Sequence, residues 1–127
     1  MRTAKLTLDG VEHLLCFSAR TVRAVSERYG GLDKMSDAFA GYDTAKTLDE
    51  ALWMLSAMMD AGDRYAKLSG LENPPPVSYE DMYDLCGMDD MENLKDKVFE
   101  TIANSKSTTV EVEPPKNVKT AQSRQGK

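Results

Sequence analysis

The chain has few of the residues on which small active sites and metal centres depend. Its 127 residues include one histidine, two cysteines and one tryptophan. Cys16 and Cys86 stand far apart and form no Cys-x-x-Cys pair, so neither a disulfide framework nor a zinc site is indicated. We expect two buried or half-buried thiols in a reducing compartment. His13 has no serine or cysteine motif to activate, and we interpret it as a structural or surface histidine.

Long apolar runs are also missing. No stretch approaches the length of a membrane span, and the N-terminus has no apolar signal core, so we expect a cytoplasmic protein without membrane contact. The glycines lack the spacing of a phosphate-binding loop. The acidic clusters at 80–84 and 89–92 lack the alternating oxygen ligands of a calcium loop. The sequence therefore predicts no enzyme, no cofactor and no bound metal.

The charge is acidic and unevenly distributed. The formal net charge is −5, and residues 1–103 carry 11 Lys and Arg against 19 Asp and Glu. Residues 104–127 carry 5 Lys and Arg against 2 Asp and Glu. A nucleic-acid-binding protein usually has a clustered basic face, so the acidic body argues against a nucleic-acid partner. The length fits one domain, and we expect a compact α+β domain over 1–103 followed by a flexible basic tail over 104–127.

The chain opens with the pattern of a β-hairpin over Lys5–Phe17. Asp9-Gly10 lies between alternating apolar and polar residues, and this pair suits a type I′ turn, which needs positive φ at both central residues. Ser18 is a good N-cap for a helix through Tyr29. Gly30-Gly31 supplies the left-handed residue that ends many helices.

The rest of the chain predicts helices. Thr47-Leu-Asp-Glu50 is a capping box that opens a long helix over Leu48–Leu68, and Gly62 inside it predicts a kink or local break. An extended connector, Glu72–Pro76, separates it from the last helices. Two short helices are expected over Leu32–Phe39 and Tyr79–Leu85, and a last helix capped by Asp89 or Asp90 is expected through about Ala103. The predicted fold is therefore an N-terminal β-hairpin packed on a mostly α-helical bundle of four to five helices, with a flexible C-terminal tail.

Methionines gather in the long helix and after the prolines. Met packs adaptably and is common both in cores and at binding surfaces that accept several partners. One interpretation is ordinary core filling. The other is a groove for apolar helical segments of a partner. Trp53 favours a surface role, because the long helix already has enough apolar residues for its core face. The candidate partner-binding residues are Trp53, Met54, Met58, Met59, Met82 and Met91.

The opening of the chain resembles the tail assembly chaperones of long-tailed, siphovirus-type bacteriophages. Those proteins typically begin with a strand, a turn, a second strand ending in Phe, and a helix closing with Glu-x-x-Tyr-Gly and a Leu. Here the hairpin ends in Phe17, and the next helix ends in Glu27-Arg28-Tyr29-Gly30-Gly31-Leu32. The resemblance extends in helical pattern to about Leu71, a little over half of the chain. The region after the prolines matches only in being helical, acidic and followed by a tail.

The resemblance implies a chaperone rather than an enzyme. Such proteins bind the tape-measure protein, keep it soluble and help recruit tail-tube subunits during tail morphogenesis. They act in the cytoplasm of the bacterial host, tend to self-associate weakly and are absent from the mature virion. In many phages a ribosomal frameshift also yields a longer form. The alternatives are another phage tail or head–tail structural or completion protein, and a small bacterial regulator that binds a protein through its helical face.

Overall fold

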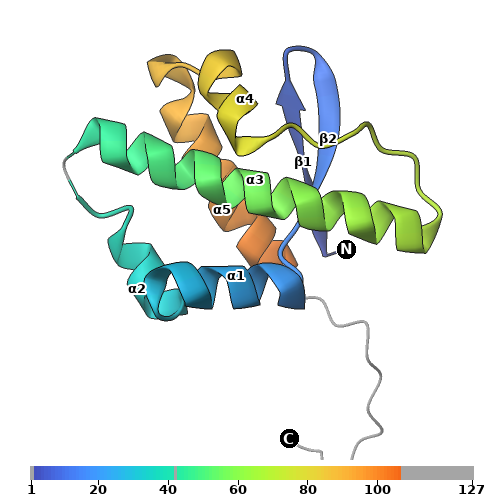
Figure 1. Cartoon of the computed structure of the whole chain (residues 1–127), viewed down its shortest axis with the longest axis horizontal. Coiled ribbons are helices and arrows are strands. Elements are labelled where there is room, and N and C mark those ends of the chain that lie inside the picture. The colour runs from blue at the N-terminus through green and yellow to red at the C-terminus, as the bar shows by residue number, and fades with distance from the viewer. Residues whose placement is uncertain (1, 42, 107–127) are drawn as a thin grey trace, which may run out of the picture.

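A β-hairpin and four α-helices are arranged around a fifth, long central α-helix in the computed structural model (Figure 1). The structure describes residues 2–41 and 43–106. The predicted α+β class, with an N-terminal hairpin on a helical bundle, is confirmed. The elements, in chain order, are β1 (Thr3–Leu8), β2 (Val11–Cys16), α1 (Ala19–Tyr29), α2 (Leu32–Asp37), α3 (Thr44–Ser69), α4 (Tyr79–Leu85), the 3₁₀-helix η1 (Met88–Asp90) and α5 (Met91–Asn104).

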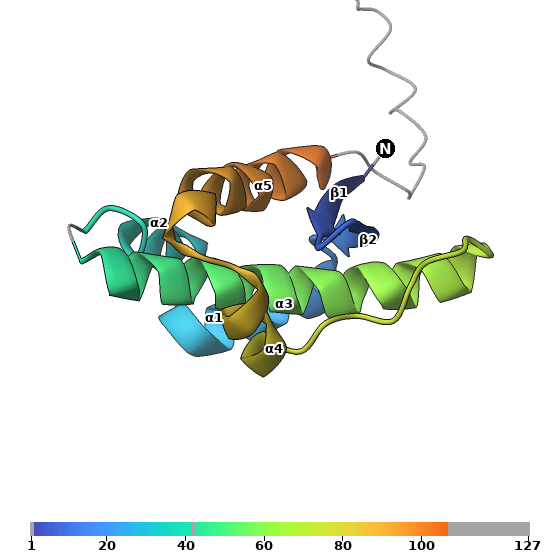
Figure 2. The same ribbon diagram turned by 90° about the horizontal axis from the view of Figure 1, so that it is seen from above.

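The hairpin follows the predicted turn chemistry. Asp9 and Gly10 have φ values of 49° and 80°, both positive, as a type I′ turn requires. The strands are antiparallel, with Leu8 opposite Val11 at the turn. Strand β2 packs against α3 and β1 packs against α5, so the hairpin lies between these two helices (Figure 2).

Helix α3 begins about one turn earlier than predicted. Its N-cap is Asp43, whose side chain accepts a hydrogen bond from the backbone N–H of Lys46 at 3.1 Å. The backbone N–H of Thr47 already donates to the Asp43 carbonyl oxygen at 2.9 Å, so Thr47 lies inside the helix. The predicted capping box is therefore wrong. Glu50, its other half, binds instead across the interface to α1.

Gly62 produces no break, because α3 runs without interruption from Thr44 to Ser69. Glycine is needed at this position for another reason, which is that the backbone of β2 leaves no room for a side chain. A Cβ atom at Gly62 would lie 2.0 Å from the carbonyl oxygen of Leu14 in β2. The backbone of the hairpin therefore approaches α3 more closely than any side chain at this position would allow. Leu15, which follows Leu14 in β2, is fully buried, as are Leu55 and Met58 in α3.

The connector after α3 runs back along the molecule and is tied to it at two points. The Asn73 side-chain oxygen accepts a hydrogen bond from the backbone N–H of Leu14 at 2.9 Å. The backbone N–H of Val77 approaches the Met59 sulfur at 3.1 Å. Ser78 then caps α4 as predicted, by accepting from the Asp81 N–H at 3.1 Å. These contacts place α4 over α3.

The end of α5 extends the body slightly beyond the predicted boundary at residue 103. Asn104 is the last residue of α5, and its side-chain amide donates to the Thr3 carbonyl oxygen at 2.8 Å. This bond ties the last helix to the first strand. The remainder of the predicted flexible tail, from residue 107 onward, lies outside the described residues. Within residues 2–41 and 43–106, no helix combines the length and the apolar character needed to cross a membrane.

Gly62→Ala tests the close approach of β2 to α3. Alanine favours a helix interior by about 1 kcal/mol over glycine, so helix propensity alone predicts stabilisation. We expect the opposite, a net loss of about 2 kcal/mol in the free energy of unfolding, because the new methyl group overlaps a backbone oxygen that cannot rotate away. Urea unfolding measures the difference.

Gly41→Ala is the matched control for that substitution. A Cβ atom there would meet nothing within 4 Å, and Gly41 is not among the residues with positive φ. We expect its unfolding free energy to stay close to that of the parent. A Gly62→Ala variant as stable as Gly41→Ala would show that β2 does not hold this position.

Candidate protein-binding site

The predicted methionine groove is not exposed. Met54, Met58 and Met59 in α3 and Met82 in α4 are fully buried, each with 0% exposure. The prediction that these side chains line an open groove is therefore wrong, and core packing accounts for them. The physical reason is that β2 and α4 both contact α3, so more of its surface is covered than its own sequence indicates. The remaining two candidates, Trp53 and Met91, are half-buried.

Trp53 belongs to the joint between α1 and α3. The guanidinium carbon of Arg28 lies 4.5 Å from the Trp53 ring centroid, which is a cation–π distance. The Tyr29 ring meets the same indole edge-on, with centroids 5.8 Å apart. Trp53 thus packs against the end of α1.

A buried carboxylate completes this joint. Arg28 donates from Nε and Nη2 to Glu50 Oε1 at 3.1 and 3.0 Å, and the Tyr29 hydroxyl donates to the same oxygen at 2.6 Å. Glu50 is only 9% exposed, so these charge-assisted bonds compensate for its loss of hydration. Burial and the hydrogen bond to Glu50 together raise the pKa of Tyr29 well above its ordinary value. Arg28 and Tyr29, at the end of α1, therefore have a structural role here.

The neighbouring carboxylate, Asp49, connects α3 to α4. Its Oδ1 accepts hydrogen bonds from the hydroxyls of Tyr79 and Tyr83, and its Oδ2 lies 3.9 Å from Arg28 Nη2. Burial acts to raise the pKa of Asp49. The two tyrosine hydrogen bonds and the Arg28 charge outweigh it, so the net pKa is below the ordinary value. Adjacent residues of α3 thus hold two different helices.

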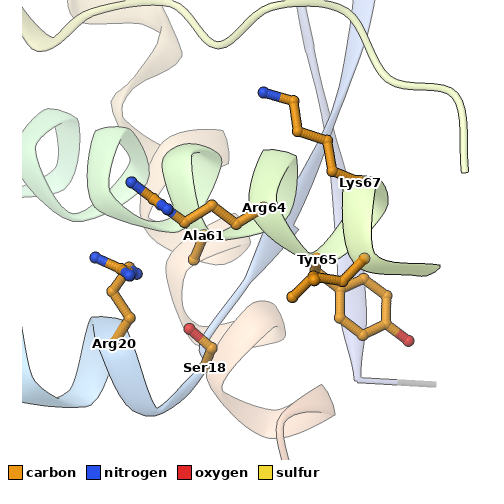
Figure 3. A pocket seen from close by; sticks show the side chains of 7 residues that line it. Ser18, Arg20, Ala61, Arg64, Tyr65 and Lys67 are labelled. Carbon is orange, nitrogen blue, oxygen red and sulfur yellow. The ribbon is translucent and has the colours of Figure 1, made fainter. Parts of the chain in front are cut away.

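An open cavity lies between the start of α1 and the C-terminal half of α3 (Figure 3). Its volume is about 380 Å³, which is in the range of ligand-binding clefts. The cavity brings together the N-cap of α1 and one face of α3, two segments that are far apart in the sequence. It is lined by Ser18, Arg20, Ala61, Arg64, Tyr65, Lys67 and Leu68. We call it the α1–α3 cleft.

The α1–α3 cleft is basic although the body of the protein is acidic. Its lining includes three cationic side chains and no carboxylate. Lys67 is paired with Asp63 at 2.9 Å, whereas Arg20 and Arg64 make no ion pair with any residue in the described ranges. Asp60 and Asp63 lie in the adjoining hollow with the same three cations. Burial raises the pKa of Asp60, and Arg64 partly offsets that effect.

The same cleft carries an unusually exposed apolar side chain. Leu68 is 89% exposed, and the half-buried Tyr65 lies beside it on α3. Arg64 and Leu68 are four residues apart and so share one face of the helix. A surface with cations next to an aliphatic side chain can contact carboxylates and apolar groups of one ligand together.

A second surface with the opposite charge lies on α4 and η1. Tyr83, Leu85 and Met88 are 46%, 44% and 69% exposed. The sequence has no lysine or arginine between Lys67 and Lys95, while the acidic residues around these side chains are numerous. We call these three residues the α4–η1 patch.

The histidine and the two cysteines lie apart from one another in the described part of the chain. His13 lies in β2 and is 3% exposed, and burial lowers its pKa, which agrees with the structural rather than the surface interpretation. Cys16 and Cys86 are free thiols whose pKa values burial raises, which lowers their reactivity at neutral pH. Among the residues that the structure describes, no group of three or more His, Cys, Asp or Glu side chains is placed to hold a metal ion.

Comparison with protein-family models, with curated proteins and with solved structures gives no significant match for this chain.

Sequence reasoning missed the residues of the α1–α3 cleft. A partial signal exists, because the spacing of Arg64, Lys67 and Leu68 places all three near one face of a helix. Arg20 belongs to another helix, and only the packing of α1 on α3 brings it beside them. No local pattern carries that information.

Arg28→Ala tests the joint between α1 and α3. The substitution leaves the buried Glu50 carboxylate with only the Tyr29 hydrogen bond, and we expect the free energy of unfolding to fall by about 2 kcal/mol. Arg23→Ala is the control, because Arg23 pairs with Glu27 on the exposed face of the same helix. We expect less than about 0.5 kcal/mol for the control. Equal losses in urea unfolding would contradict the proposed role of Arg28.

Asp49→Asn tests the α3–α4 connection through its pH dependence. The pKa of Asp49 is lowered from an ordinary value of 3.8, so its ionised form stabilises the fold above that pH. This contribution is lost as pH falls through the lowered pKa. We therefore expect the parent to be more stable than Asp49→Asn at pH 7 and the difference to shrink in acid. A difference in melting temperature that is constant down to strongly acidic pH would contradict this.

Proposed function

We propose that the protein is a tail assembly chaperone of a long-tailed bacteriophage or prophage. It binds the tape-measure protein, keeps it soluble and helps recruit tail-tube subunits during virion morphogenesis. It acts in the cytoplasm of the bacterial host without enzyme activity or a cofactor and is not incorporated into the mature virion. The resemblance of residues 5–32, and the helical pattern to about Leu71, support this proposal.

The observation that carries a protein-binding function is the distribution of exposed apolar side chains. Eight large apolar side chains are exposed in the described part of the chain, and five of them fall within residues 68–88. They form two groups, one near the end of α3 and the other on α4 and η1, and exposed apolar groups of this kind offer contact points for a protein partner. The five are Leu68, Leu71, Tyr83, Leu85 and Met88.

The two surfaces carry opposite charges, so one molecule can contact two different segments of a long partner. Leu68 lies beside cations in the α1–α3 cleft, whereas the α4–η1 patch lies among carboxylates. The resemblance implies a long helical tape-measure protein as the partner, which several copies of this protein would coat. Weak contacts that are repeated along such a chain gain strength through multivalency. The weak self-association that the resemblance implies would add to this effect.

Co-expression with the tape-measure protein of the same phage, followed by affinity capture and a solubility assay, tests the proposal. We expect co-purification and a larger soluble fraction of the tape-measure protein. A Leu85→Ser and Met88→Ser double variant should reduce capture about tenfold with little change in melting temperature, because both side chains are exposed apolar groups. Val11→Ser, an exposed apolar residue at the hairpin turn, is the control and should not reduce capture.

The co-expression experiment can also contradict the proposal. If the tape-measure protein neither co-purifies nor becomes more soluble, the chaperone proposal fails. Detection of the protein in purified particles by mass spectrometry would then favour a tail or head–tail structural subunit.

A further inference from the structure

We infer that the α1–α3 cleft binds an acidic helical segment of a partner protein, with a carboxylate between Arg20 and Arg64 and an aliphatic side chain against Leu68. The inference depends on the cleft alone. It would hold for any partner with this chemistry, whether or not the protein is a phage chaperone.

The arrangement of the two arginines indicates an anion. Figure 3 shows Arg20 reaching from α1 and Arg64 reaching from α3 toward the same side of the cavity, and both line the α1–α3 cleft and the hollow that adjoins it. Neither makes a direct ion pair in the described ranges, and the first turn of α1 contains no acidic residue. Asp60 and Asp63 lie in the adjoining hollow, where Arg64 acts on Asp60 electrostatically, but neither carboxylate lines the cleft itself. Two like charges that face one cavity repel each other, and an anion bound between them removes that repulsion.

The apolar part of the cleft indicates a polypeptide rather than a small anion. Leu68 is 89% exposed, and Ala61 and Tyr65 extend the apolar lining beside it. A free phosphate would leave these groups in contact with water. A nucleic acid is disfavoured because the body that surrounds the cleft is acidic.

The spacing along α3 indicates a helical ligand. Arg64 and Leu68 are separated by four residues, about one helical turn. A partner helix with Glu and Leu at the same separation presents a carboxylate and an aliphatic group with matching spacing. A cavity of about 380 Å³ has room for a few such side chains, not for a whole domain.

Fluorescence anisotropy with two labelled peptides tests the inference. One is a short helical peptide in which Glu and Leu recur four residues apart, and the other has Lys in place of every Glu. We expect the full chain to bind the Glu peptide, with an affinity that falls as salt is added. Arg20→Glu and Arg64→Glu should each weaken binding about tenfold, and Leu68→Ser severalfold.

Lys46→Glu is the matched control. It makes the same charge change at an exposed position of α3 that does not line the cleft, so binding should be unchanged. The Arg20→Glu and Arg64→Glu double variant should reverse the preference and bind the Lys peptide. Melting temperatures near that of the parent would show that these exposed substitutions leave the fold intact.

Several results would overturn the inference. These are no binding of the Glu peptide, equal binding of the two peptides by the parent, unchanged binding in the arginine variants, or complete competition by inorganic phosphate at low concentration. Analytical ultracentrifugation could also overturn it. If the parent self-associates and Arg64→Glu abolishes the self-association, the α1–α3 cleft binds a second copy of this chain instead. Failure of the tape-measure capture alone would not affect this result, because the peptides do not depend on that partner.

Discussion

The closeness of β2 to α3 at Gly62 is the constraint on which the arrangement depends. The Leu14 carbonyl oxygen occupies the space where a Cβ atom would lie, so the hairpin can rest its backbone directly on the helix. Strand β2 ends beside α3, and α1 begins shortly afterwards with Ser18 as its N-cap. This is why Ser18 and Ala61, from opposite sides of that junction, line one cavity. The glycine contact therefore helps to fix the side of the α1–α3 cleft at which α1 begins.

The other end of α1 is fixed by polar rather than apolar contacts. Arg28 and Tyr29 converge on Glu50, and Asp49 beside it accepts hydrogen bonds from α4. Two consecutive carboxylates of α3 thus hold helices that precede and follow it in the chain. Since removal of one partner leaves a buried charge uncompensated, this joint fixes the direction of α1 more strongly than a surface ion pair would.

Much of the fold could be predicted from the sequence, because its signals are local. The Asp9-Gly10 turn and the Ser78 cap each depend on neighbouring residues only, and the structure has both. The prediction of a capping box is wrong although Thr47-Leu-Asp-Glu50 fits the pattern, because Asp43 caps the helix about one turn earlier. Glu50 is then occupied by a contact with residues more than twenty positions away. Local patterns cannot rank such alternatives.

The candidate site was less predictable because it depends on which apolar residues remain uncovered. Periodicity marks Met58 and Met82 as apolar but does not tell whether they are buried or exposed. The packing of β2 and α4 on α3 leaves both buried. Leu68 carries the same kind of signal, yet it is left exposed at the end of the helix. Leu68 differs from the buried methionines in lying beside cationic side chains, to which Arg20 is added from α1. An exposed leucine in isolation is ordinary, whereas one beside two arginines without ion-pair partners in the described ranges has a chemistry that selects its ligand.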